Sequence, residues 1–200
     1  MTSDLDLASL LASRLCHDVV GPVGAIQNGL ELIAEDDSMA EMAMDLIKKS
    51  AAQATAKLQY ARMAYGAAGG ADVLDPGEAG RLTEGMFSGE RATLDWRFAG
   101  PPTDRNTVKL AMLMATFALA AVPRGGDITV EHDDTGCISV RASGNPARVP
   151  PFTDLMTMGG EATDPRAVQA MLMARLAAAS GATIVVEADD SAFVARTTKS

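Results

Sequence analysis

The sequence is poor in cysteine, histidine and basic residues, and each shortage excludes a class of protein. Its two cysteines, Cys16 and Cys137, stand far apart with neither a CxxC pair nor Cys/His spacing, which excludes a disulfide framework and a zinc site. We expect both thiols to be buried among apolar side chains. The 17 Lys and Arg against 26 Asp and Glu leave a net charge of −9. Nucleic acid is therefore not expected as a partner, because phosphate binding needs clustered basic residues.

Long apolar runs are also missing. The most apolar run, Val108–Val122, has 15 residues, whereas a membrane-spanning helix needs about 20. No basic segment followed by an apolar stretch opens the sequence, so we expect no secretory signal. With 48% apolar residues in 200, the chain can bury a core of its own. These features predict a cytoplasmic protein without a membrane partner.

The first 65 residues have the spacing of two amphipathic helices. Apolar or small side chains recur in steps of three and four from Asp4 to about Ala34, and again from Met39 to Tyr65. The polar stretch Glu35–Ser38 separates them, so the pattern predicts an antiparallel helical hairpin. A lone hairpin leaves much of each apolar stripe exposed, and a second copy would cover it. We therefore expect a homodimeric four-helix bundle.

Beyond the hairpin the pattern is mixed. We divide the chain into a hairpin at 1–68, a linker at 69–75 that continues a segment rich in glycine and alanine, and a second domain at 76–200. The expected helices of that domain are 76–91, 106–122 and 164–180, and its expected strands are 93–98, 127–133, 136–142, 183–188 and 192–197. Helices combined with an antiparallel or mixed sheet favour a two-layer α+β domain.

One of the two histidines, His17, lies in the first predicted helix. It stands midway between Leu15 and Val19 of the apolar stripe, and two residues along a helix correspond to a rotation of about 200°. We therefore expect the ring to face solvent, with a neutral nitrogen available as a nucleophile at cytoplasmic pH. Asp18 follows directly and can orient the ring, an arrangement typical of an activated nucleophile.

Glycines surround this histidine. Gly21 and Gly24 share its helix face, and Pro22 removes a backbone hydrogen bond nearby. Glycine in an exposed helix costs up to about 1 kcal/mol relative to alanine, so a bare backbone here favours the close approach of a partner protein. The alternative is that a surface histidine beside an aspartate is incidental and that the glycines serve packing. The second histidine, His132, is expected to be an exposed strand residue.

The stretch CHDVVGP resembles the phosphoacceptor motif of sensor histidine kinases. In that family the motif lies on the first helix of a dimeric hairpin and is followed by a Bergerat-type ATP-binding domain, which is the order of segments in this chain. Residues 119–130, LAAVPRGGDITV, look like the segment after the kinase asparagine box, and SGATIVVEAD looks like the end of the kinase domain. The resemblance covers nearly the whole chain and implies a histidine-kinase-like α/β sandwich after the hairpin.

The ATP-binding boxes of the kinases, however, are replaced. Phe117 stands where kinases carry the magnesium-binding asparagine, and ASGNP at 142–146 lacks the acid that holds the adenine amino group. DPRAVQ at 164–169 replaces the last glycine-rich phosphate box. A phosphoacceptor hairpin with a degenerate nucleotide fold resembles the ChpT-like histidine phosphotransferases, as do the stretches SRLCHDVVGPVGAIQNGLELI and YARMAYGAAGG.

This resemblance implies a homodimeric phosphorelay intermediate with no ATP hydrolysis and no cofactor of its own. It would accept a phosphoryl group from the receiver domain of a hybrid histidine kinase and pass it to the receiver domain of a response regulator, with Mg²⁺ held by the partner. His17 is the expected phosphoacceptor and Asp18 the residue that orients it. The residues expected to dock the partner are Arg14, Val20, Gly21, Gly24, Gln27, Tyr60, Arg62 and Met63.

Two alternatives stay open at this point. The chain could be a divergent ATP-dependent histidine kinase, which micromolar ATP binding would favour. It could also be a non-catalytic dimerisation or regulator-binding module, which labelling that does not depend on His17 would favour. Gly21 lies four residues after the histidine, where many bifunctional kinases carry a Thr or Asn that orients a water. Since glycine has no side chain, we expect weak phosphatase activity.

Overall fold

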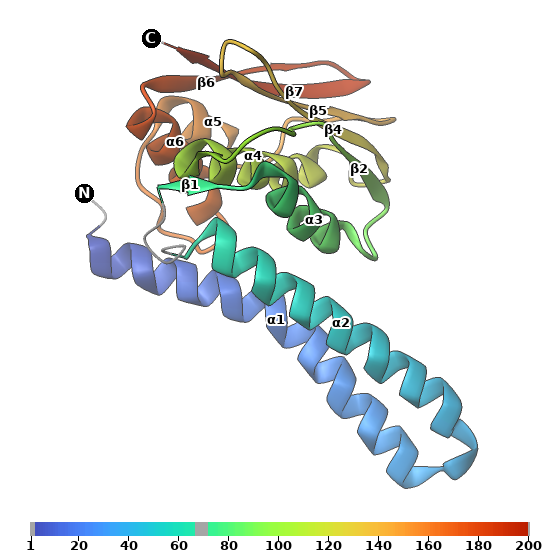
Figure 1. Ribbon diagram of the computed structural model, residues 1–200. Helices are drawn as coiled ribbons and strands as arrows, with labels where there is room; N and C mark the ends of the chain where they lie inside the picture. The colour runs from blue at the N-terminus through green and yellow to red at the C-terminus, as the bar shows by residue number, and fades with distance from the viewer. Residues whose placement is uncertain (1–2, 67–71, 200) are drawn as a thin grey trace.

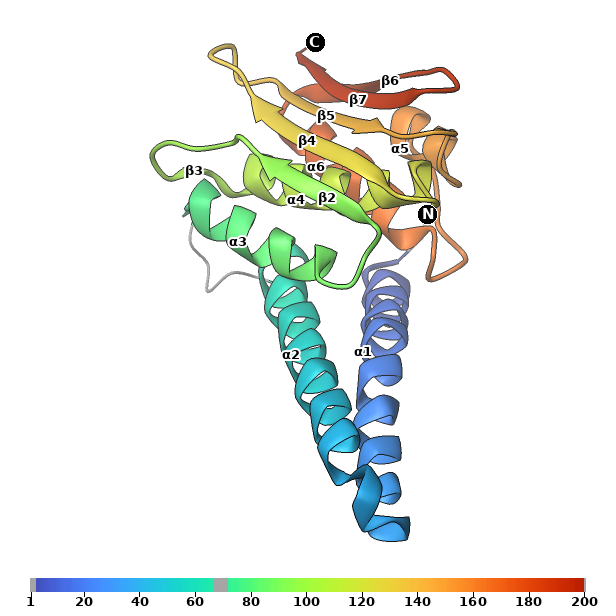
Figure 2. The same ribbon diagram turned by 90° about the vertical axis from the view of Figure 1, so that its right-hand side faces the viewer.

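A long helical hairpin forms a stem, and the rest of the chain forms a domain that sits on one end of it. The computed structural model describes residues 3–66 and 72–199. The turn of the hairpin lies at the end far from the domain (Figure 1), and both helices run down from the domain when the molecule is turned by 90° (Figure 2). Within the described residues, no helix is long and apolar enough to cross a membrane.

The first helix of the stem, α1 (Asp4–Glu35), begins with a capping box. The Ser3 hydroxyl accepts a hydrogen bond from the backbone N–H of Asp6, whose carboxylate accepts one from the backbone N–H of Ser3. The helix continues through Pro22, which is buried. The predicted helix from Asp4 to about Ala34 is therefore confirmed.

The second helix of the stem, α2 (Ala40–Ala64), follows a short 3₁₀ turn, η1 (Asp37–Met39), and runs back along α1 (Figure 1). Gly29 of α1 allows the two helices to approach closely, because a Cβ at that position would lie 2.7 Å from Ile47 Cγ1. Gly29 and Pro22 are seven residues apart and mark the face of α1 that packs towards α2. The predicted antiparallel hairpin is confirmed.

The domain contains a mixed five-stranded sheet. Its strands are β2 (Ala92–Trp96), β4 (Gly126–His132), β5 (Ile138–Ser143), β6 (Ala182–Ala188) and β7 (Ala192–Lys199). The order is β2-β4-β5-β7-β6, with β2 parallel to β4 and the other neighbours antiparallel. Two short strands, β1 (Val73–Leu74) and β3 (Thr103–Asp104), pair with each other.

Helices cover the face of the sheet that looks towards the stem (Figure 1). They are α3 (Pro76–Phe87), α4 (Arg105–Ala118), α5 (Thr153–Met158) and α6 (Val168–Ala179), with a 3₁₀ turn η3 (Leu119–Ala121) after α4. Most residues of α4 are buried, as expected of a helix packed between a sheet and other helices. The predicted order, a helical hairpin followed by a domain of helices packed on a mixed sheet, is confirmed.

Several predicted boundaries are wrong, and turn residues explain two of them. α3 ends at Phe87 instead of residue 91, because Gly89 takes a φ of +93° and turns the chain. α6 begins at Val168 instead of residue 164, because the Asp164 carboxylate accepts the backbone N–H of Arg166 and forms a turn. The sequence patterns missed α5, which lies in a Pro-rich segment.

Two further predictions concern the linker and the cysteines. The linker at 69–75 lies partly outside the described residues. The expectation of two buried cysteines is wrong, since Cys16 is exposed and Cys137 is half-buried. Cys16 lies six residues before Pro22, so it projects from a different face of α1 than the one packed towards α2.

Candidate functional site

His17 projects from the middle of α1 into solvent. Its side chain is 80% exposed, so the prediction that the ring points away from the hairpin contact is confirmed. Position 17 is five residues before the buried Pro22, about 140° away around the helix. The imidazole can therefore meet a partner protein without any opening of the fold.

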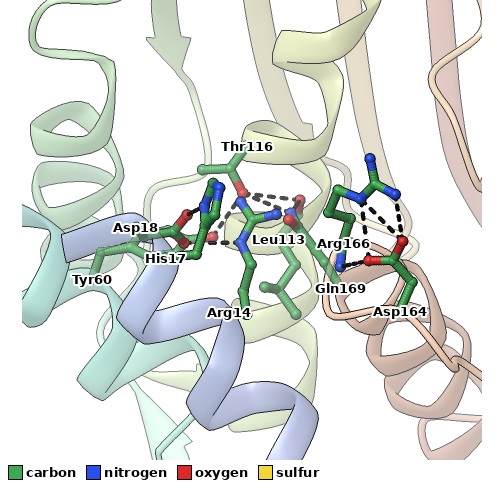
Figure 3. A network of polar contacts seen from close by, with 9 residues as sticks. All are labelled: Arg14, His17, Asp18, Tyr60, Leu113, Thr116, Asp164, Arg166 and Gln169. Atoms are coloured by element: carbon green, nitrogen blue, oxygen red, sulfur yellow. Dashed lines mark hydrogen bonds and ion pairs between the residues drawn. The ribbon is translucent and has the colours of Figure 1, made fainter. Parts of the chain in front are cut away.

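A fixed carboxylate lies beside the histidine. The Nδ1 atom of His17 is 3.6 Å from Oδ1 of Asp18, while the Nε of Arg14 donates to Oδ2 of Asp18 at 2.9 Å (Figure 3). Burial is the largest single influence and would lower the pKa of the Arg14 guanidinium, but the charge and hydrogen bond of Asp18 together with the nearby Tyr65 and Tyr60 outweigh it, and the pKa of Arg14 is raised. One oxygen of Asp18 is thus held by Arg14, which turns the other oxygen towards the ring.

The surface next to His17 has little side-chain cover. A Cβ added at Gly21 or at Gly24 would meet nothing within 4 Å, and Val20 is 70% exposed. Gln27 is also exposed and donates to the carboxylate of Glu31 on the same helix. These four expected docking residues therefore lie along one open strip of α1, where a partner can approach the backbone closely.

The expectation that Tyr60 contributes to the exposed docking surface is corrected by its burial. Tyr60 is only 2% exposed, and its hydroxyl donates to the backbone carbonyl of Met112 at 3.1 Å and lies 2.8 Å from Oγ1 of Thr116. Met63 is likewise half-buried and packs against the domain core, whereas Arg62 is exposed. The end of α2 is turned towards α4, so of these three residues Arg62 alone is left open to a partner.

The domain also reaches α1 close to His17, a contact that the sequence reasoning missed. Leu7, Leu10 and Leu11 pack against a small buried cluster that consists of Ala162, Ala167, Val168 and Met171. Leu10 and His17 are seven residues apart, so they share one helix face and lie about 10 Å apart along the axis. The edge of the domain therefore lies beside the histidine. Leu10, an apolar residue on the helix face of His17, is the feature of the sequence that could have indicated this contact.

The segments that replace the kinase boxes have other partners here. Phe117 is buried in the domain core. Hydrogen bonds from the side chain and the backbone N–H of Arg166 lower the pKa of Asp164 to about 2. No group of three or more His, Cys, Asp or Glu side chains in the described part of the chain is placed to hold a metal ion.

Several large apolar side chains of the stem stay exposed, namely Val20, Val23, Leu30, Met42, Met44, Leu46 and Leu58. Near the domain, an apolar groove of about 410 Å³ lies between the two helices, lined by Leu11 and Leu15 of α1 and by Leu58 and Tyr65. Such a surface is larger than a few scattered apolar residues and is typical of a protein interface.

Comparisons with known proteins agree on one family. The family model of the histidine phosphotransferase C-terminal domain matches residues 76–192. A protein phosphotransferase ChpT from Brucella abortus (strain 2308) is 42% identical over 193 residues, which cover 93% of this chain and 92% of that protein. The chain is also similar to a solved structure of a bacterial phosphotransferase, with a TM-score of 0.88, 38% identity, and coverage of 99% of this chain and 98% of the other. These similarities favour the phosphotransferase prediction over an ATP-dependent kinase.

Proposed function

We propose, from the premise that this chain belongs to the ChpT-like histidine phosphotransferases, that His17 is the residue that carries the phosphoryl group. The chain is a histidine phosphotransferase of a phosphorelay, with response regulators as partners. The observation that supports His17 is an imidazole 80% exposed to solvent beside a carboxylate that Arg14 holds in place.

The proposed step is a direct transfer between an aspartate and the histidine. Nε2 of His17, the ring nitrogen on the far side from Asp18, attacks the phosphorus of an aspartyl phosphate. As the N–P bond forms, the P–O bond to the receiver's aspartate breaks and that carboxylate leaves with the electron pair. Attack on phosphohistidine by the aspartate of a second receiver reverses the chemistry. No nucleotide is consumed in either direction, and positioning does most of the catalytic work.

Asp18, held by Arg14, would stabilise the positive charge that develops on the ring. Phosphorylation at Nε2 leaves a proton on Nδ1 and makes the ring cationic, and the Asp18 oxygen 3.6 Å from Nδ1 stabilises that form. Arg14, expected from the sequence to dock the partner, is bound to the other oxygen of Asp18. We therefore assign Arg14 to the orientation of Asp18. The negative charge of the phosphoryl group itself would be neutralised by Mg²⁺ held by the receiver.

The proposed partners are two kinds of receiver domain, one from a hybrid histidine kinase and one from a response regulator. Both would dock on the strip formed by Val20, Gly21, Gly24 and Gln27, where open backbone permits close approach. Docking there brings an aspartyl phosphate to a ring that stands one turn away. The proposal includes a cytoplasmic location, with which the net charge of −9 is compatible.

We also propose that the stem pairs with a second copy to form a four-helix bundle. Val23 and Leu30 are 51% and 57% exposed, although both are apolar and lie seven residues apart on one face of α1. His17, Gly21 and Gly24 lie about 100–160° around the helix from Val23, so a partner stem packed on that face leaves the ring and both glycines free, with Val20 and Gln27 at the border of the two surfaces. A symmetric dimer would then present two phosphoacceptor sites.

A two-arm labelling experiment tests this function. The purified chain is incubated either with radiolabelled ATP and Mg²⁺ alone or with a receiver domain already phosphorylated on its aspartate. We expect acid-labile label on the chain in the second arm only, and none on His17→Ala. Label from ATP alone would favour the kinase alternative, and equal label on both variants would favour an incidental histidine.

A further inference from the structure

A polar network at the junction of the stem and the domain involves three side chains, of which Tyr60 and Gln169 are buried and Thr116 is half-buried. Tyr60 comes from α2, Thr116 from α4 and Gln169 from α6, so the three residues join the stem to two different helices of the domain (Figure 3). The Nε2 amide of Gln169 donates to the carbonyl of Leu113 at 2.8 Å and to Oγ1 of Thr116 at 2.9 Å. We name Tyr60, Thr116 and Gln169 together the junction network.

One arrangement of hydrogens satisfies every donor in the junction network. The two amide hydrogens of Gln169 go to the carbonyl of Leu113 and to the hydroxyl of Thr116. The Thr116 hydroxyl then donates to the Tyr60 oxygen, and the Tyr60 hydroxyl donates to the carbonyl of Met112. Because Tyr60 and Gln169 are only 2% and 5% exposed, water cannot replace these partners without opening the junction.

This geometry makes the junction network specific for one arrangement of stem and domain. The apolar contacts of Leu7, Leu10 and Leu11 with the domain tolerate small shifts, since hydrophobic contact is not directional. A shift of α2 along α4, by contrast, would take the buried phenol of Tyr60 away from the Met112 carbonyl and from the Thr116 hydroxyl, which Gln169 holds from α6. At the end of α2, buried Lys109 of α4 adds a hydrogen bond to the carbonyl of Gly66, where a cation also suits the helix C-terminus.

The fixed arrangement matters because the domain lies beside the phosphoacceptor. Leu10 packs on the domain and shares the helix face of His17, so a protein that approaches His17 passes the domain edge. If the domain turned about the stem, the space in front of the ring would change. A receiver would then find the correct arrangement only part of the time, and its apparent affinity would fall by that fraction.

We propose that Tyr60, Thr116 and Gln169 are positioning residues for phosphotransfer, which hold the C-terminal domain in one orientation beside His17 so that a receiver meets a preformed approach path. This role rests on the function proposed above. The junction network does not touch the phosphoryl group, so it acts on docking, and its loss raises KM for the phosphorylated receiver while kcat is unchanged.

Matched threonine variants separate this role from a structural one. Thr116→Val keeps the shape of the side chain but removes the hydroxyl, and Thr116→Ser keeps the hydroxyl. Thr83→Val is the control, because Thr83 is a buried threonine of the same domain whose hydroxyl bonds only to a carbonyl of its own helix, α3. We expect Thr116→Val to raise KM about fivefold or more with kcat within about twofold. Thr116→Ser and Thr83→Val keep the KM of the natural chain.

Domain orientation is measured directly by electron spin resonance distances between labels at Glu41→Cys on the stem and Asp190→Cys on the domain. Both positions are exposed, and Cys16 and Cys137 are replaced by serine in every variant. Excess unlabelled protein ensures that at most one subunit of an oligomer carries labels. We expect one narrow distance distribution for the natural junction and a broad one for Thr116→Val. If Thr116→Val does not fold, Tyr60→Phe removes the hydroxyl at the other end of the contact.

A narrow distribution in Thr116→Val, or a broad one with unchanged KM, would overturn the positioning role. Equal losses in Thr116→Val and Thr83→Val would overturn it as well, because they would reflect stability alone. The distance measurement involves no phosphate. A chain that orders its domain through the junction network but transfers nothing to His17 would therefore refute the proposed function and not the ordered junction.

Discussion

Arg14 and Asp18 form an ion pair one helical turn apart, with the Arg14 Nε atom 2.9 Å from Oδ2 of Asp18. Both side chains are mostly buried, at 27% and 19% exposure, beside an imidazole that is 80% exposed. A partly buried pair is screened less by water and salt than a surface pair. The carboxylate that faces His17 is therefore held in place before any partner arrives.

This pair predicts the effect of Asp18→Asn. The amide removes the negative charge beside Nδ1 of His17 and weakens the bond to Arg14, while the side-chain volume stays the same. We expect the rate of transfer from a phosphorylated receiver to fall about ten- to a hundredfold, less than the loss of a full general base. Rapid-quench kinetics measure it. Glu35→Gln, at the exposed far end of α1, is the control and should leave the rate unchanged; equal rates for all three proteins would contradict the role of Asp18.

Gly21→Ala and Gly24→Ala should change stability and docking in opposite directions. A Cβ at either position meets open space, so each variant gains helix propensity and raises the free energy of unfolding by up to about 1 kcal/mol. The same methyl group lies between the helix backbone and a docked receiver. We expect a higher urea midpoint together with a severalfold higher KM for the phosphorylated receiver.

Gly29→Ala is the contrasting control for the glycine series. Its Cβ would lie 2.7 Å from Ile47 Cγ1 and 3.2 Å from the carbonyl oxygen of Ala43, so the hairpin must shift and stability should fall. If Gly21→Ala and Gly24→Ala dock receivers as tightly as the natural chain, the open strip is not the docking surface.

Charges at the exposed apolar positions Val23 and Leu30 of α1 should separate the proposed dimer. We expect the natural chain to behave as twice its mass of 20.7 kDa and the double variant Val23→Glu/Leu30→Glu to behave as a monomer. Light scattering after gel filtration measures the mass, and circular dichroism checks that the helices persist. Ala52→Glu is the matched control, because Ala52 is exposed and lies nine residues after Ala43, on the opposite face of α2. A monomeric natural chain would exclude the four-helix bundle.

His132 predicts a pH dependence of stability. Its ring stacks on Phe98 with centroids 4.2 Å apart, and burial lowers its pKa, assisted by Lys199 and opposed by Asp133. Below about pH 6.5 the unfolded chain binds more protons at this residue than the folded chain does, so stability is lost as the pH falls through that value. Urea midpoints between pH 8 and pH 5 should fall more for the natural chain than for His132→Gln. Parallel curves for the two proteins would contradict this reading.

Local pattern was enough to predict the elements that place His17. The three- and four-residue spacing gave α1 and α2, and the position of His17 between Leu15 and Val19 gave its exposure. The expected docking role of Tyr60, by contrast, placed a buried residue on the surface. Helical spacing shows which residues share a face, but the partner of that face depends on where a distant segment of the chain folds back.

The contact between stem and domain illustrates this limit. Thr116 and Gln169 lie 56 and 53 residues from their partners in the junction network, and short-range patterns carry no information about such pairs. Likewise, α5 lies in a Pro-rich segment without clear periodicity. The two strands at β1 and β3 are only two residues long and too short to show alternation.

The most direct test of the account maps the phosphoryl group on the chain itself. A receiver domain phosphorylated on its aspartate is mixed with the natural chain or with His17→Gln, the reaction is quenched in base within seconds, and peptides are sequenced by mass spectrometry. The account predicts phosphohistidine at His17, loss of that label when a second unphosphorylated receiver is added, and no labelled peptide from His17→Gln. Phosphate at any other residue, or equal labelling of both proteins, would contradict it.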